Sequence, residues 1–185
     1  MLTIELNEIL ELHELYLKGD IRGLRADLTG ANLADANLAD ANLTRAIFIG
    51  ANLSGANLSG ANLFGVNFAD ANLTIANLTK SNLTVATLTI ANFADANLTR
   101  ANLTGANLTG ANLPGANLTG ADLSRASFTG ADFTGANFTM KENDILIEQL
   151  KLKELTEDVS YQVKKIEALK KELRELFVRS EFRRC

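Results

Sequence analysis

Few side chains of this chain are of the types that catalyse reactions or hold transition metals. The chain has one histidine, His13, and one cysteine, Cys185. A catalytic nucleophile needs a neighbouring base, and a structural zinc site needs four Cys or His ligands. His13 falls at helical spacing among Leu and Ile residues, so we interpret it as part of a buried helix face rather than as a ligand. We therefore expect no catalytic residue, no cofactor and no metal site. A single cysteine also excludes an internal disulfide and favours a reducing compartment.

The remaining candidates are carboxylates spread along residues 26–140. Asp35 and Asp40 lie five residues apart, and this spacing allows either a weak cation contact or two solvated carboxylates. The simpler solvated interpretation is the favoured one. The segment carries seven acids against four bases, namely Asp27, Asp35, Asp40, Asp70, Asp95, Asp122 and Asp132 against Arg45, Lys80, Arg100 and Arg125.

These residues belong to a five-residue repeat of the form Ala-Asn-Leu-x-x, which runs twenty-three times from Ala26 to Met140. The large apolar residue of each unit, called its centre here, falls at every fifth position from Leu28 to Phe138 and is always Leu or Phe. Within a unit the order is small apolar, polar and large apolar, and this alternation is typical of a β-strand. In one continuous strand, however, a repeat of odd length would point the same side chains to opposite faces in successive units. The last two residues must therefore turn the chain, and the second is Gly at eleven positions and Asp at four. The repeat predicts an all-β solenoid with centres and alanines inside.

The repeat from Ala26 to Met140 resembles the pentapeptide repeat family. This resemblance implies a right-handed quadrilateral β-helix with four units per turn, and therefore about 5–6 coils for these units. At ~4.8 Å per stacked strand the β-helix is about 27 Å long. The resemblance also points to a bacterial protein of a type common in cyanobacteria.

Grouping the residues by a period of twenty separates the four faces of the expected β-helix. Three faces carry an outward Asn or Asp at every turn, and amides stacked in register can hydrogen-bond along the column. The fourth face interrupts this column with Ile47, Thr87 and Ser127. Two interpretations stay open: neutral variation, or a flatter and less polar contact surface. In the second, the candidate interaction residues are Ile47, Ile49, Thr87 and Ile90, whereas Phe64, Ile75 and Val85 are apolar residues that we place on other faces.

The first twenty residues predict a capping helix. A helix from Thr3 to Lys18 would have an apolar side made of Leu6, Ile9, Leu10, His13 and Leu17, with glutamates on its other sides. Gly19 would end this helix. Such a helix would cover the open end of the solenoid. We assign residues 21–140 to the β-helix and interpret Ile21 to Arg25 as an irregular first unit, with Ile21 in the small inward position and Gly23 at the centre.

Residues 141–185 are a different kind of sequence, dense in charge and free of Gly and Pro. The pattern predicts one long α-helix that forms a coiled coil about three heptads strong. Self-association is favoured over a helix that folds back as a C-terminal lid, and the pairing orientation stays open. The candidate oligomerisation residues are Leu152, Leu155, Val159, Ile166, Leu169, Leu173 and Leu176.

Two functions fit these observations. The first is a non-enzymatic protein-interaction scaffold that self-associates, with an unknown protein partner and without nucleic acid or membrane. The second follows from the family resemblance, since some members mimic DNA and bind type II topoisomerases such as gyrase. Seven acids minus four bases leave only −3 over the repeat, which argues against this alternative. The first residues resemble neither a signal peptide nor a membrane span, so we expect a cytoplasmic protein.

Overall fold

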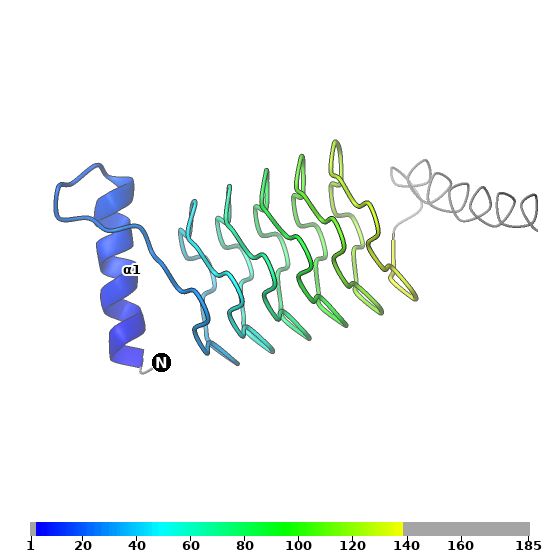
Figure 1. Cartoon of the computed structure of the whole chain (residues 1–185), viewed down its shortest axis with the longest axis horizontal. Coiled ribbons are helices and arrows are strands. Elements are labelled where there is room, and N and C mark those ends of the chain that lie inside the picture. The colour runs from blue at the N-terminus through cyan, green and yellow to red at the C-terminus, as the bar shows by residue number, and fades with distance from the viewer. Residues whose placement is uncertain (1–2, 139–185) are drawn as a thin grey trace, which may run out of the picture. The chain divides into compact units, whose positions relative to one another are not determined.

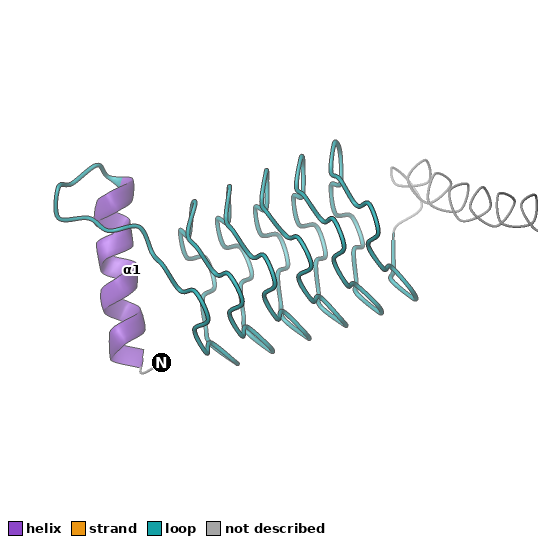
Figure 2. Ribbon diagram, in the orientation of Figure 1, coloured by secondary structure: helices purple, strands orange, loops and turns teal. Residues whose placement is uncertain are grey.

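The structure is a computed structural model that describes residues 3–138. It contains one described helix, α1 (Thr3–Leu17), followed by a stack of coils (Figures 1 and 2). The predicted helix at 141–185 and its seven oligomerisation residues lie outside the described residues.

Successive coils pair in parallel at a spacing of twenty residues. Isolated bridges join each outward residue to the outward residue twenty positions later, from Asp27 with Ile47 to Asn117 with Asn137. Twenty residues hold four units, so the expected four units per turn are confirmed. Within residues 3–138 the pairing never lengthens beyond single bridges, because each unit has only three residues between corners. The low strand content is therefore a consequence of the short repeat.

Backbone hydrogen bonding explains why the unit has five residues. In an interior unit the small residue closes a turn onto the preceding centre, the outward residue donates to the coil before, and the centre and second corner residue donate to the coil after. The first corner residue donates to the side chain of its own asparagine. In unit 71–75 these N–H donors pair as Ala71 with Phe68 O (3.0 Å), Asn72 with Ala51 O (2.9 Å), Leu73 with Asn92 O (2.7 Å), Thr74 with Asn72 Oδ1 (3.1 Å) and Ile75 with Ala94 O (2.9 Å). Every backbone donor of the unit has an acceptor.

The core is the column of centres and small residues predicted from the repeat. Centres from Leu28 to Leu123 are at most 4% exposed, and the small inward residues from Ala46 to Ala121 are at most 6% exposed. Ala31, Ala36 and Ala41 of the first coil are half-buried. Phe48 and Phe68 occupy successive coils of one column with their ring centroids 4.9 Å apart. Ser81 fits a small inward position because its hydroxyl donates to the Leu78 carbonyl at 2.8 Å.

Helix α1 ends as the sequence predicts. Gly19 has a φ of +74°, and its N–H donates to the Tyr16 carbonyl while Asp20 N–H donates to the Leu15 carbonyl, the pattern of a Schellman motif. The face predicted to be apolar is half-buried to buried, with His13 fully buried.

The segment between α1 and the first coil corrects the sequence interpretation. Ile21 is 99% exposed and does not point inward, so residues 21–25 are not a repeat unit. Gly23 instead lies against the backbone of Tyr16, where a Cβ atom would overlap the helix. The segment returns along α1, donating from Leu24 N–H to the Leu12 carbonyl at 3.0 Å. Packing against α1 overrides the five-residue spacing here.

Candidate interaction surface

Three faces of the coil stack carry the amide ladders predicted from the sequence. The Nδ2 of an asparagine donates to the Oδ1 of the asparagine one coil earlier, as from Asn52 to Asn32 (3.2 Å) and from Asn82 to Asn62 (3.2 Å). The same oxygens accept from the first corner residue's N–H and often from its hydroxyl. Asn57 accepts all three kinds of bond: from Ser59 N–H, from the Ser59 hydroxyl and from the Asn77 amide. These faces use their polar groups internally.

The fourth face lacks this ladder. Throughout residues 3–138, the amide-to-amide bonds lie on the other three faces. Ile47 and Thr87 alternate with asparagines along the interrupted column, so no two amides are neighbours. Ile47 also removes the acceptor that the first corner residue needs. In the described part of the chain, the N–H groups of Ile49 and Thr89 have no such side-chain acceptor.

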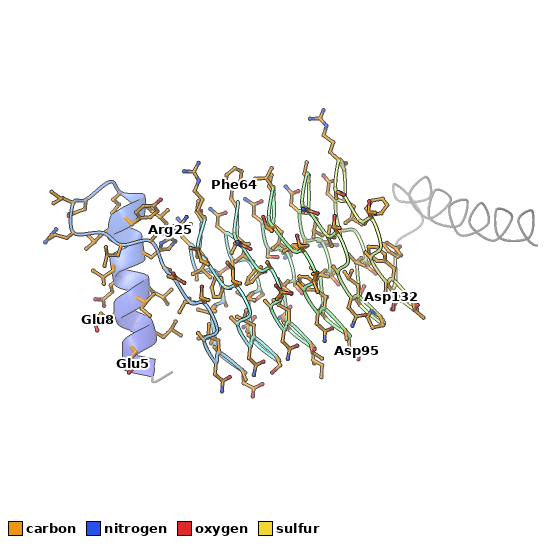
Figure 3. All side chains as sticks on the ribbon, in the orientation of Figure 1. Glu5, Glu8, Arg25, Phe64, Asp95 and Asp132 are labelled. Carbon is orange, nitrogen blue, oxygen red and sulfur yellow. The ribbon has the colours of Figure 1, made fainter. Side chains whose placement is uncertain are left out.

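The predicted interaction residues lie on or beside this interrupted face, in two coils that are separated by the coil of Asn67. Ile47 and Thr87 occupy its outward column and are half-buried. Ile49 and Ile90 lie at the corner that follows, 38% and 62% exposed. Phe64 and Val85 end units of the neighbouring face and lie at the corner before the interrupted face, 37% and 51% exposed, so they border it. Figure 3 shows Phe64 projecting outward at one margin of the coils and Asp95 at another.

A run of strained corners winds around the coils and borders this face at Asp70, Val85 and Ile90. Second corner residues have φ between +51° and +70° throughout the coils, a conformation that suits Gly. Seven successive corners from Asp70 to Arg100 carry side chains instead, and glycines occupy the four corners before and the four after. We call these seven residues the central corner run: Asp70, Ile75, Lys80, Val85, Ile90, Asp95 and Arg100.

Three β-branched residues of the central corner run are outliers in two respects. Ile75, Val85 and Ile90 have φ of 60°, 51° and 59°, where β-branched side chains crowd the backbone. They are also exposed, Ile75 by 68%. The side chains of Val85 and Ile90 point toward the next coil. A Cβ atom at Gly105 would lie 3.4 Å from Val85 Cγ1, and one at Gly110 would lie 3.6 Å from Ile90 Cγ1. Neither burial nor backbone conformation favours these residues.

Carboxylates occupy separate positions on the surface. Asp35 and Asp40 lie at successive corners, each with its carboxylate directed over the glycine of the next coil, Gly55 or Gly60. Among residues 3–138, no three Asp, Glu, His or Cys side chains are grouped as metal ligands would be. Asp35 and Asp40 belong to no such group, and the solvated interpretation stays a prediction.

Three outward aspartates stand in the asparagine columns near the two ends of the described coils. Hydrogen bonds from the side chains of Thr29, Ser124 and Thr134 lower the pKa of the carboxyls two positions before them. Thr29 and Thr134 hydroxyls both donate at 2.6 Å. Backbone N–H bonds act in the same direction. These carboxylates, Asp27, Asp122 and Asp132, therefore stay ionised at neutral pH.

Sequence reasoning missed two features of this surface. It assigned the asparagines to stacking alone, although the spacing of Asn and Thr by two residues is an Asx-turn signal. It also explained the corner residues by turn preference and did not predict backbone strain at corners that lack glycine. The signal for this strain is the presence of β-branched residues, Ile75, Val85 and Ile90, at positions where other units have glycine.

The family model for pentapeptide repeats (8 copies) matches residues 26–65, 67–105 and 101–139 of the chain. The chain is similar to the pentapeptide repeat protein Rfr23 from the cyanobacterium Cyanothece 51142, with 31% identity over 69% of this chain and 97% of that one and a TM-score of 0.52. It is also similar to alr5209, a pentapeptide repeat protein from Nostoc PCC 7120, with 30% identity over 70% and 93% of the two chains and a TM-score of 0.47.

A trypsin-treated form of QnrB1, a plasmid-mediated fluoroquinolone resistance protein, is 22% identical over 70% of each chain with a TM-score of 0.32. No similar sequence was found among curated proteins. Pentapeptide repeat proteins fold as right-handed quadrilateral β-helices. In the part of the chain that the structure describes, no helix has the length and apolar character needed to cross a membrane.

Proposed function

This chain belongs to the pentapeptide repeat family, and we propose that it is a non-enzymatic protein-interaction scaffold. In this proposal the chain binds a protein partner through the interrupted face and self-associates through residues 141–185. Family members are generally structural scaffolds rather than enzymes, and the side chains available here agree with that role.

The observation that carries the proposal is the exposure of β-branched residues at strained corners. Holding a residue in a sparsely populated backbone region costs on the order of 1–3 kcal/mol, and such residues gather at binding sites. The other described second-corner positions carry Gly, Asp, Arg or Lys, and none of them carries a β-branched residue. Val85 and Ile90, which border the interrupted face, therefore reduce stability without filling the core, and a binding role gives a reason for them. Ile75 has the same strain at a corner between two other faces.

The interrupted face offers a partner both apolar contact and hydrogen-bond donors. Ile49, Phe64 and Ile90 supply exposed apolar surface. The N–H of Ile49 is left without a side-chain acceptor because Ile47 replaces the usual asparagine. A partner that places apolar side chains and a carbonyl group on this face would meet both needs.

Self-association rests on the heptad pattern of residues 141–185. The apolar stripe of Leu152, Leu155, Val159, Ile166, Leu169, Leu173 and Leu176 is too narrow to stabilise an isolated helix in water, so it needs a partner surface. A second copy of the same stripe supplies one.

Light scattering in reducing buffer separates the two parts of the proposal. We expect the whole chain to be an oligomer and a chain ending at Met140 to be a monomer. If both are monomers, residues 141–185 do not assemble the protein.

Partner binding is tested by comparing proteins captured by the unmodified chain and by a Val85→Asn/Ile90→Asn variant. Asparagine tolerates positive φ, so the variant keeps the corner conformation and loses only apolar surface. Asp70→Asn, at φ 58° in the same run, is the matched control. A captured protein should depend on Val85 and Ile90 and not on Asp70. Equal capture by all three would place the partner site elsewhere, and inhibition of gyrase supercoiling would favour topoisomerase binding instead.

A further inference from the structure

We propose that His13 is a pH-sensitive latch: in its neutral form it holds α1 on the first coil, and its protonation releases α1 and uncovers the N-terminal edge of the β-helix.

The imidazole ring of His13 takes the place of a carbonyl acceptor that the first unit of the repeat lacks. In later units the small residue's N–H donates to the centre carbonyl three positions before it, as from Ala31 to Leu28 at 3.0 Å. Ala26 begins the first unit and has no preceding centre. Its N–H donates instead to His13 Nδ1 at 3.0 Å. One hydrogen bond, accepted by a side chain of the helix, thus joins α1 to the start of the first coil.

This bond requires the neutral ring. Because Nδ1 accepts a hydrogen bond, the single proton of the neutral imidazole is on Nε2. The ring is 0% exposed, and Nε2 is buried with no hydrogen-bond partner among residues 3–138. Protonation adds a hydrogen to Nδ1 that points at the Ala26 N–H donor. It therefore replaces the bond by two opposed donors and places a cation in a buried position.

The groups around the ring compensate for that charge only in part. From α1, Tyr16 stacks on His13 with centroids 5.8 Å apart and an interplanar angle of 16°. The linking segment brings the cation of Arg25, which lies beside α1 in Figure 3. The first coil contributes the backbones of Ala26 and Thr44. Burial is the main cause that lowers the pKa of His13, Arg25 lowers it further, and the backbone of Thr44 opposes both.

The direction of the pH effect follows from these groups. A histidine freed from the cap titrates near its ordinary pKa of about 6.5, and the latched ring titrates lower. Above pH 6.5 neither state takes the proton, and α1 stays docked. Below it the released state is protonated first, so the released population rises up to about tenfold per pH unit until the latched ring also titrates. His13 is the only histidine, so no second imidazole contributes in this range.

Release has a structural consequence at the edge of the β-helix. In later coils the outward residue's N–H donates to the coil before, as from Asn52 to the Ala31 carbonyl. The first coil has no coil before it, so its outward N–H groups form an unpaired edge at this end. An uncovered parallel edge is a template for pairing with another chain. The latch therefore makes access to this edge depend on acidity.

The test uses the whole chain in reducing buffer. Nuclear magnetic resonance follows the Cε1–H of the single histidine from pH 8 to pH 5 and gives the pKa of His13 directly. Amide hydrogen exchange, corrected for its intrinsic pH dependence, follows α1 and the N–H groups of Leu24 and Ala26. The variants are His13→Gln, which removes the imidazole, and His13→Gln/Glu8→His, which returns a histidine to an exposed site on α1.

We expect a His13 pKa below 6.5 and loss of protection at α1, Leu24 and Ala26 between pH 6.5 and 5.5, by up to about tenfold per pH unit. The loss should vanish in His13→Gln and stay absent in the double variant. A pKa of 6.5 or above, or unchanged protection of α1 in the unmodified chain, would overturn the proposal even if the variants fail to fold.

Discussion

Outward asparagines within the amide ladders, such as Asn52, Asn72 and Asn82, have a donor role and an acceptor role at once. The Oδ1 accepts from the first corner residue of the same unit, and the Nδ2 donates to the asparagine one coil earlier. In Asn72 the acceptor bonds come from Thr74 N–H at 3.1 Å and its hydroxyl at 2.6 Å, while Nδ2 donates to Asn52 at 3.3 Å. Aspartate can fill the first role only, and it stands in these columns only near the ends of the repeat, at Asp27, Asp122 and Asp132.

Asn72→Asp should therefore cost about 1 kcal/mol of unfolding free energy, the net value of one hydrogen bond, because the new carboxylate cannot donate to Asn52. Asn67→Asp is the control, since Asn67 has Ile47 and Thr87 beside it in its column and keeps its acceptor bond to Ala69 N–H. Thermal unfolding of the two variants at neutral pH measures the difference. Equal melting temperatures would mean that the ladder adds no stability.

Glycine at the corners serves two separate purposes. Gly50 and Gly55 have φ of 62° and 68°, so both avoid the strain of a side chain in the left-handed region. A Cβ atom at Gly50 would meet open space, whereas one at Gly55 would overlap the carboxylate of Asp35.

Gly50→Ala should cost about 1 kcal/mol through backbone strain, and Gly55→Ala should cost more because Asp35 must also move. Denaturant unfolding compares the two. Adding Asp35→Gly should return the Gly55→Ala protein to the stability loss of Gly50→Ala. A Gly55→Ala loss that Asp35→Gly does not reduce would show that the carboxylate is not the obstacle.

At the scale of elements, α1 and the linking segment form one cap. The Schellman motif at Gly19 reverses the chain, Gly23 allows it to lie on the helix backbone, and His13 receives the N–H of Ala26. Asp20 and Arg22 pair at 2.7 Å within the turn. The cap depends on close backbone approach more than on its amphipathic pattern.

Gly23→Ala should separate the linking segment from α1, because its Cβ would overlap backbone atoms of Leu15 and Tyr16 that no rotamer change can move. We expect faster amide exchange at Leu24 and Ala26 and a stability loss of roughly 1–3 kcal/mol. Gly19→Ala is the control, with open space around its Cβ and only the cost of a φ of +74°. Retained protection at Leu24 in Gly23→Ala would contradict the described packing.

For the whole β-helix, stability is the sum of contacts between neighbouring coils, because each coil touches only the coils before and after it. A defect in the core column therefore breaks two interfaces at once. A change at an exposed corner leaves both nearly intact.

Leu83→Asp should prevent soluble expression or lower the melting temperature strongly, since Leu83 is 0% exposed and an unpaired buried carboxylate costs several kcal/mol. Val85→Asp is the control: it adds the same charge two residues later, at an exposed corner of a kind that Asp occupies four times. Thermal unfolding of both proteins checks the assignment of centres. Tolerance of Leu83→Asp would contradict it.

The sequence by itself determined the solenoid, because a five-residue period kept without insertion allows one way to bury its Leu and Phe centres. It also determined the amide ladders, the helix stop at Gly19 and the column in which the ladder is interrupted. These features depend on local spacing and on one repeat number, so they can be derived residue by residue.

Only the tertiary structure decided how the first unit begins and which corners are strained. Ile21 has the spacing of an inward residue but lies in solvent, since packing of Gly23 on α1 sets the path of the chain. The role of His13 depends on contact between segments thirteen residues apart. The strain at Ile75, Val85 and Ile90 depends on backbone angles that stacking of the coils imposes. The repeat places these residues at glycine positions, but their own local preferences do not predict those angles.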